Sequence, residues 1–314
     1  MNEQKLRQII KRHEKWLHNE SGGEKADLYG ADLSENNLSG ANLSCADLSH
    51  ANLCNVDLSS ADLRGINLRG AYLRCANLSK AYIHDANLYQ ANLINANLKE
   101  AKLHRVNLSE ANLSEANLNE ADLRDANLSE IDLHFANLCY ADLCYVNLSK
   151  ADLYGTNLRD AYLINANLKE ANLSDADLSG INLRNANLYA ADLSGTNLCD
   201  ANLSCADLTM TNLRGAILCD VNLDGTCLYE ATLGGTILSE QIIQIGPIGS
   251  PRAYTLYWVE RDIVQCGCWS VGGDVSLAEF KQWVNDVYPE DNLETLRYRR
   301  EYLAAIAMFE LLRK

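Results

Sequence analysis

The feature that most constrains this chain is a five-residue repeat, which runs without insertion or deletion from Ala26 to Glu240 and comprises 43 units. The third residue of each unit is Leu, with Ile83 as the one exception, the first is mostly Ala and the second is mostly Asn or Asp. Positions four and five vary widely. An internal repeat of this regularity is typical of a solenoid, in which each unit packs only against its neighbours.

A period of five fits neither regular secondary structure. Five residues advance about 500° on an α-helix, so the Leu residues would spiral around its whole surface. On a continuous strand, an odd period would send successive Leu side chains to opposite faces. One inward Leu per unit therefore requires a corner in every unit. Glycine, which tolerates turns well, favours positions four to five for that corner. The glycines at position five are Gly30, Gly40, Gly65, Gly70, Gly155, Gly180, Gly195, Gly215, Gly225 and Gly235.

Positions one and three then face inward, and no aromatic residue occupies either position in any unit. A narrow interior of stacked Leu and Ala layers fits this pattern, and four units per turn fill such a ring with little void. At about 4.8 Å per coil of four units, nearly 11 coils give a rod of roughly 50 Å. The sequence predicts an all-β, four-sided β-solenoid.

Units such as Ala41-Asn42-Leu43-Ser44-Cys45 and Ala121-Asp122-Leu123-Arg124-Asp125 resemble the A(D/N)LXX units of the pentapeptide repeat family. The resemblance covers about two thirds of the chain. It implies a right-handed quadrilateral β-helix; the repeat period and the number of units per coil do not by themselves set the hand. It also implies no catalytic activity, because the family has no common active site.

Both ends of a solenoid need covering, because an open end exposes a Leu layer and unpaired strand edges. We expect three regions: residues 1–25 as a helical cap and linker, 26–240 as the solenoid, and 241–314 as a small α+β domain. Residues 2–18 have apolar side chains at helical spacing and predict an amphipathic helix, which could instead mediate dimerisation.

The composition changes after Glu240, where all three Pro and three of the four Trp lie. Residues 253–259 and 263–269 predict a β-hairpin. Ser276 and Glu279 form the pattern of a capping box, so a helix is expected to begin there and to end before Pro289. A second helix is expected over residues 292–313.

Charge and cysteine content limit the possible functions. The chain has 27 Lys plus Arg and 42 Asp plus Glu, a net charge of −15, and the whole excess belongs to the repeats. That balance argues against direct binding of nucleic acid. No apolar run is long enough to span a membrane. The charged first residues predict no signal peptide, and 11 Cys without paired spacing favour a reducing cytoplasm.

The sequence offers no convincing cofactor, metal or catalytic site. Cys266 and Cys268 lack the second ligand pair that a zinc site needs. With four units per coil, His84 should stack on His104 beside Asp85, and Cys199 on Cys219. We interpret these pairs as parts of solvated side-chain ladders. We therefore predict a protein that is not an enzyme and holds no cofactor or metal.

One candidate surface is an acidic stripe along one side. Like charges on neighbouring strands are mildly destabilising, so the stripe is either retained for a cationic partner or serves solubility. It consists of Glu100, Glu120, Asp160, Asp200, Asp220 and Glu240.

The other candidate surface is aromatic. Phe135, Tyr140 and Tyr145 occupy position five of three consecutive units, so they should surround the middle of the rod on three sides. Tyr154 returns to the side of Phe135 one coil later. Clusters of exposed aromatic residues often mark contact sites.

The function that the sequence favours is a non-enzymatic scaffold that binds an unidentified protein partner, with a homodimer also possible. The alternative is an acidic DNA mimic, similar to the quinolone-resistance branch of the family, which occupies the DNA groove of type II topoisomerases such as gyrase. Against the alternative, these repeats have no projecting loops, Phe is absent from the central positions, and a separate domain follows them.

Overall fold

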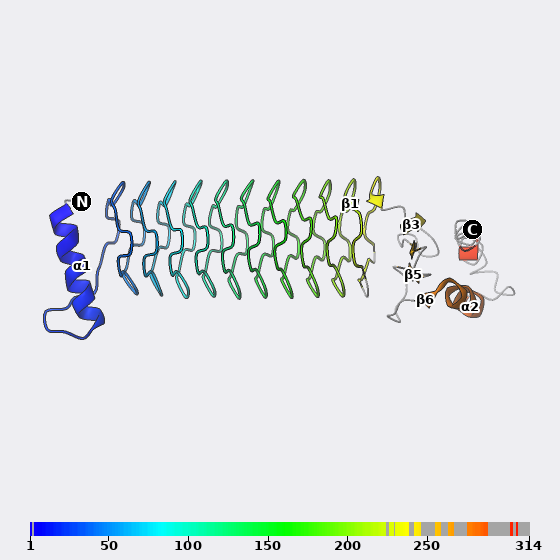
Figure 1. Ribbon diagram of the computed structural model, residues 1–314, viewed down its shortest axis with the longest axis horizontal. Coiled ribbons are helices and arrows are strands. Elements are labelled where there is room, and N and C mark those ends of the chain that lie inside the picture. The colour runs from blue at the N-terminus through cyan, green and yellow to red at the C-terminus, as the bar shows by residue number, and fades with distance from the viewer. Residues whose placement is uncertain are drawn as a thin grey trace.

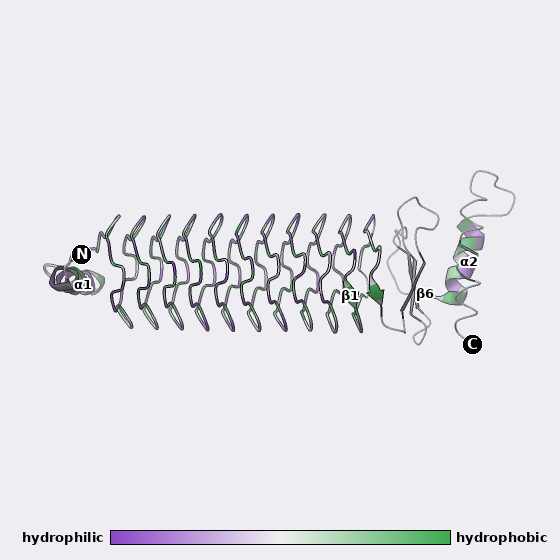
Figure 2. Ribbon diagram, turned by 90° about the horizontal axis from the view of Figure 1, so that it is seen from above, coloured by the Kyte–Doolittle hydropathy of each residue, from purple (hydrophilic) through white to green (hydrophobic). Residues whose placement is uncertain are grey.

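The computed structural model describes residues 1, 3–223, 226–228, 230–238, 242–245, 255–258, 263–266, 275–287, 302–303 and 306. Helix α1 (Glu3–Leu17) lies at one end of a long rod of stacked coils, and a small sheet and helix α2 (Leu277–Val287) follow the other end (Figure 1). Figure 2 shows the same arrangement from above. No helix in the described part of the chain has the length and apolar composition to cross a membrane.

The coils of the rod are joined by a parallel ladder with a step of four units. Position two of each unit pairs with position two of the unit four places later, as Asp27 does with Asp47. The N–H of Leu28 donates to the carbonyl of Asp47 over 2.7 Å, and the N–H of Asp47 donates to Ala26 over 3.0 Å. The N–H of Gly30 donates to Ser49 over 2.9 Å. Four units therefore make one coil, as predicted, and positions two, three and five bond to the neighbouring coils.

Where position two is Asn or Asp, the corner satisfies the remaining two N–H groups of the unit. The N–H of Ala51 donates to the carbonyl of Leu48 over 3.1 Å, which closes a turn through Ser49 and His50. The N–H of Ser49 donates to the side-chain Oδ1 of Asp47 over 2.9 Å. His50 has φ of 58°, the left-handed conformation that a type II turn requires at its third residue. The predicted corner at positions four to five is confirmed, and the Asn or Asp at position two caps it.

The core is a column of Leu and Ala layers along the rod axis. Away from the ends of the rod, positions one and three are buried, as Ala136 and Leu138 show with 1% of each residue exposed. Thr156 replaces Ala at position one and is also fully buried. Its hydroxyl donates to the carbonyl of Leu133 over 2.9 Å, so the substitution buries no unsatisfied polar group.

The first coil has no preceding coil to pair with, and α1 covers part of this open edge. Leu6 of α1 is buried against the core. His13 is fully buried: its Nδ1 accepts from the N–H of Ala26 over 3.1 Å, and its Nε2 lies 3.0 Å from the carbonyl of Ser44. The N-terminal amine of Met1 donates to the carbonyl of Asp32 over 2.6 Å. Each of these three backbone groups would otherwise lack the partner that it has in later coils.

The last described coils carry two short strands, β1 (Ile217–Leu218) and β2 (Ile237–Leu238), which pair in parallel. Beyond them a four-stranded antiparallel sheet has the order β3 (Ile242–Ile245), β4 (Thr255–Trp258), β5 (Ile263–Cys266) and β6 (Val275–Ser276). The β4–β5 pair is the predicted hairpin. Strands β3 and β6 were not predicted; β6 has only two residues.

Helix α2 begins at the predicted capping box. The N–H of Glu279 donates to the Ser276 hydroxyl over 3.2 Å, and the N–H of Ser276 donates to the Glu279 carboxylate over 2.9 Å. The backbone N–H and the hydroxyl of Ser276 both donate to the Glu279 carboxylate, which lowers the pKa of Glu279. Val287 ends the helix before Pro289, as expected. Most of the second helix predicted over 292–313 lies outside the described residues, as do the side chains of Cys266 and Cys268.

Candidate interaction surfaces

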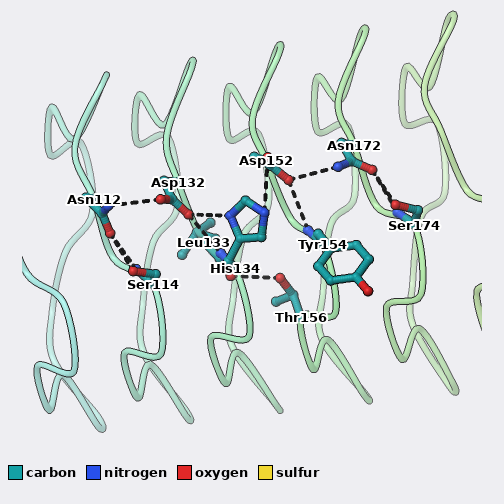
Figure 3. Close-up of polar contacts among 10 residues, drawn as sticks. All are labelled: Asn112, Ser114, Asp132, Leu133, His134, Asp152, Tyr154, Thr156, Asn172 and Ser174. Carbon is teal, nitrogen blue, oxygen red and sulfur yellow. Dashed lines mark hydrogen bonds and ion pairs between the residues drawn. The ribbon is translucent and has the colours of Figure 1, made fainter.

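The richest cluster of side chains lies on one side of the rod, which we call the His134 face. It is formed by every fourth unit, from the unit 31–35 to the unit 231–235. Residues four units apart on this face are neighbours on successive coils. Asp132 and His134 come from one coil, and Asp152 and Tyr154 come from the next (Figure 3). Phe135 belongs to the same unit as His134.

Phe135 and Tyr154 form an aromatic pair on this face, in which Phe135 is exposed and Tyr154 is half-buried. Their ring centroids are 5.4 Å apart and the ring planes are inclined by 78°, an edge-to-face contact. Sixty per cent of Phe135 is exposed. Its ring lies over Gly155, where an added Cβ would stand 2.6 Å from the Phe135 ring atom Cε1. Because glycine has no Cβ, residue 155 leaves room for the Phe135 ring.

His134 lies between the two carboxylates of Asp132 and Asp152. Its Nδ1 is 2.7 Å from Asp132 Oδ1, and its Nε2 is 3.3 Å from Asp152 Oδ2 (Figure 3). Each ring nitrogen of His134 thus faces a carboxylate, which when ionised only accepts hydrogen bonds. Asp132 and Asp152 are bridge partners on adjacent coils, so the His134 ring lies between two neighbouring groups of like charge.

Two Asn side chains complete the polar column on either side of this pair. Asn112 Nδ2 donates to Asp132 Oδ2, and Asn172 Nδ2 donates to Asp152 Oδ1, each over 2.9 Å (Figure 3). Most Asn side chains of the rod donate to the preceding coil, whereas Asn112 donates to the following coil. The four-unit period places Asp132 beside Asp152, but the position of the His134 ring between them was not predicted from the sequence.

Tyr140 and Tyr145, the other two position-five aromatic residues predicted to surround the rod, lie at different corners. The Tyr140 hydroxyl bonds to the Asp160 carboxylate, which raises the pKa of Tyr140. Tyr145 is 61% exposed and lies next to the unit that carries the exposed Tyr162, because the Tyr145 N–H donates to the carbonyl of Ile164. Successive corners are a quarter turn apart, so Phe135 and Tyr145 lie on opposite corners. A flat partner cannot contact both.

The acidic stripe is partly neutralised by the chain's own cations. Lys99 lies 3.7 Å from Glu120 and 4.0 Å from Glu100, and Lys80 lies 3.7 Å from Glu100. Arg159 lies 3.4 Å from Asp160. Within the described part of the chain, Asp200 and Asp220 have no such partner, and Glu240 lies outside it.

The stacked pairs expected from the four-unit period are present. The His84 and His104 rings are 4.5 Å apart and nearly parallel. Arg105 binds the Asp85 carboxylate through two bonds of 2.8 Å, which together with His84 lower the pKa of Asp85 to about 2. The Asp85 carboxylate is therefore already paired with Arg105. No group of three potential metal ligands occurs among the described residues.

Cys199 and Cys219 also meet on successive coils. The pKa of Cys219 is raised, first by burial of the thiol and then by its hydrogen bond with Cys199. A raised pKa lowers the thiolate fraction, and with it the reactivity of this thiol.

Eight copies of a family model described as "Pentapeptide repeats" match the chain, and together they span residues 24–239. A search of curated proteins gives no match. Among solved structures, HetL, a pentapeptide repeat protein involved in heterocyst differentiation regulation in the cyanobacterium Nostoc sp. strain PCC 7120, is 34% identical. That match covers 74% of this chain and 96% of HetL, with a TM-score of 0.43.

Two further matches are more distant. A pentapeptide repeat protein of the Arabidopsis thaliana thylakoid lumen is 26% identical over 32% of this chain and 64% of its own, with a TM-score of 0.23. QnrB1, a plasmid-mediated fluoroquinolone resistance protein, is 19% identical over 67% of this chain and 94% of its own, with a TM-score of 0.33.

Proposed function

The chain belongs to the pentapeptide repeat family, and from this premise we propose that it is a non-enzymatic scaffold that binds another protein through the side of its rod. We also assign to the rod the right hand that the family resemblance implies. The three regions 1–25, 26–240 and 241–314 would then act as cap, binding rod and terminal domain.

The observation that carries this function is the aromatic pair of Phe135 and Tyr154. Core residues of the rod are Leu, Ala and other small side chains, so the pair has no part in packing the interior. Phe135 nevertheless exposes 60% of its side chain in the middle of the rod. Large aromatic side chains that a fold does not need, and that lie together on its surface, are typical of protein contacts.

Affinity capture from the native host tests this function. Immobilised wild-type protein should retain a partner that the double variant Phe135→Ala/Tyr154→Ala loses. Each truncation should cost about 1–2 kcal/mol at a contact hot spot, roughly tenfold in affinity. The matched control is Tyr29→Ala, which removes a ring that is 66% exposed near the end of the rod. If the double variant retains every protein that the wild type retains, with equal affinity, the side of the rod around Phe135 is not the binding surface.

The DNA-mimic alternative has weaker support from the contacts. Mimicry of a phosphate backbone needs uncompensated negative charge, whereas Glu100, Glu120 and Asp160 each have a Lys or Arg within 4.0 Å. We therefore favour a protein-binding scaffold.

A further inference from the structure

We propose that the partner of the His134 face presents arginine side chains, which pair with Glu115 and stack on the ring of Phe135. This inference rests on the proposed function and adds the chemistry of the partner. Its starting point is an acidic ring, which we define as position five of five successive units: Glu110, Glu115, Glu120, Asp125 and Glu130.

The acidic ring is followed directly by the three aromatic residues at position five. Glu115 and Phe135 occupy the same corner of the rod on successive coils, about 4.8 Å apart along the axis. Glu130 lies at the other corner of the His134 face, on the same coil as Phe135. The exposed ring therefore has a carboxylate one coil before it and another across the face.

Among the residues that the structure describes, neither Glu115 nor Glu130 has a Lys, Arg or His partner within ion-pair distance. Other members of the acidic ring are engaged: Glu120 has Lys99, and Glu110 accepts from the side chains of Tyr89 and Gln90. Glu115 and Glu130 thus leave uncompensated negative charge on the face where Phe135 is exposed.

The rod itself shows how its aromatic rings are covered elsewhere. Arg69 lies over the ring of Tyr89 at 5.2 Å, and Lys169 lies over Tyr189 at 5.4 Å. In both pairs the cation comes from the same position one coil earlier. At Phe135 that place holds Glu115, so a cation over the Phe135 ring has to come from another molecule and would find a carboxylate beside it.

Arginine suits this corner better than lysine. Its planar guanidinium can stack on an aromatic ring while its N–H groups donate to a carboxylate. A nucleic acid is excluded as the occupant by the charge of the face, because Glu115, Glu130, Asp132 and Asp152 would repel phosphates. The occupant is therefore an arginine-bearing segment of a protein.

The test uses a fluorescently labelled octa-arginine peptide and measures its affinity for the full chain by anisotropy at several salt concentrations. Glu115→Gln and Phe135→Leu should each weaken binding about two- to fivefold. Glu35→Gln is the matched control: Glu35 occupies the same corner and loses the same charge, but Asn55 follows it one coil later. Tyr29→Leu is the control for the ring.

Equal weakening by Glu115→Gln and Glu35→Gln would show that the peptide senses only the net charge, and would overturn the inference. An unchanged affinity in Phe135→Leu would also overturn it. Octa-lysine should bind less tightly than octa-arginine, and equal affinity would contradict the stacking on Phe135. None of these outcomes bears on the proposed function, which stands or falls with the capture experiment and holds for a partner without arginine as well.

Discussion

The Asn or Asp at position two makes hydrogen bonds that hold the rod together, although its side chain points outward. Asn117 accepts from the N–H of Asn119 over 3.1 Å and donates to Asn97 on the preceding coil over 3.4 Å. It therefore caps its own corner and joins a ladder along the rod. Units with Tyr82 or Lys102 at position two have neither bond available from that side chain. The sequence indicated only a polar outward residue here, because the cap depends on turn geometry that a pattern of letters does not contain.

His13 makes the cap at the start of the rod sensitive to pH. Burial lowers the pKa of His13 below 6.5, although the carbonyl of Ser44 opposes this shift. Because Nδ1 accepts from Ala26, the bound imidazole must be neutral. Because the pKa of His13 is lower in the folded cap than in the unfolded cap, the unfolded cap binds the proton at a higher pH than the folded cap does. The cap is therefore fully stable above about pH 6.5 and loses stability as the pH falls towards the folded-state value.

Amide hydrogen exchange of α1 measures this effect. After correction for intrinsic rates, the α1 amides should exchange faster at about pH 5.5 than at about pH 7.5. His13→Gln should remove the difference, and His18→Gln, at an exposed position of the same segment, should retain it. A pH dependence that survives in His13→Gln would assign the sensitivity to another group.

The coil was the most predictable element, and the ends were the least. A period of five with Leu at position three required a corner per unit, whereas filling the interior with Leu and Ala favoured four units per coil without fixing that number. The capping box of Ser276 and Glu279 located α2 in the same way, through a local pattern. Strands β3 and β6 left no such pattern. The pairing of His134 with Asp132 and Asp152 was also missed, because it depends on side-chain directions across two coils.

Leu138 tests the inward assignment of position three. Leu138→Asp would bury a carboxylate between Leu layers, at a cost of several kcal/mol, and should unfold the neighbouring coils. Thermal melting followed by circular dichroism should show a large fall in melting temperature. The control is Asn165→Asp, which adds the same charge at a corner and keeps the acceptor for Asn185. A Leu138→Asp variant that melts within about 2 °C of the wild type would contradict the assignment.

The rod as a body carries an excess of negative charge that its own cations offset only locally. Ion pairs such as Lys99–Glu120 are exposed and contribute little, whereas the net charge of −15 repels itself along the whole length. Salt should therefore stabilise the rod. Raising sodium chloride from about 0.02 M to about 0.5 M should raise the melting temperature by about 2–5 °C.

The charge-reduced variant Glu115→Gln/Glu130→Gln should show a smaller rise over the same salt range. A melting temperature that falls with salt would mean that attraction within the ion pairs outweighs the repulsion between like charges.

The ladder with a step of four units makes insertions and deletions act as rotations. Loss of four units would shorten the rod by one coil and leave every side chain beyond it on its original side. Loss of a single unit, such as 121–125, would keep the core intact but turn everything downstream by a quarter. Phe135 would then leave the corner of Glu115 and move to the adjoining one. Variation in repeat number can thus change which residues face a partner without changing any of them.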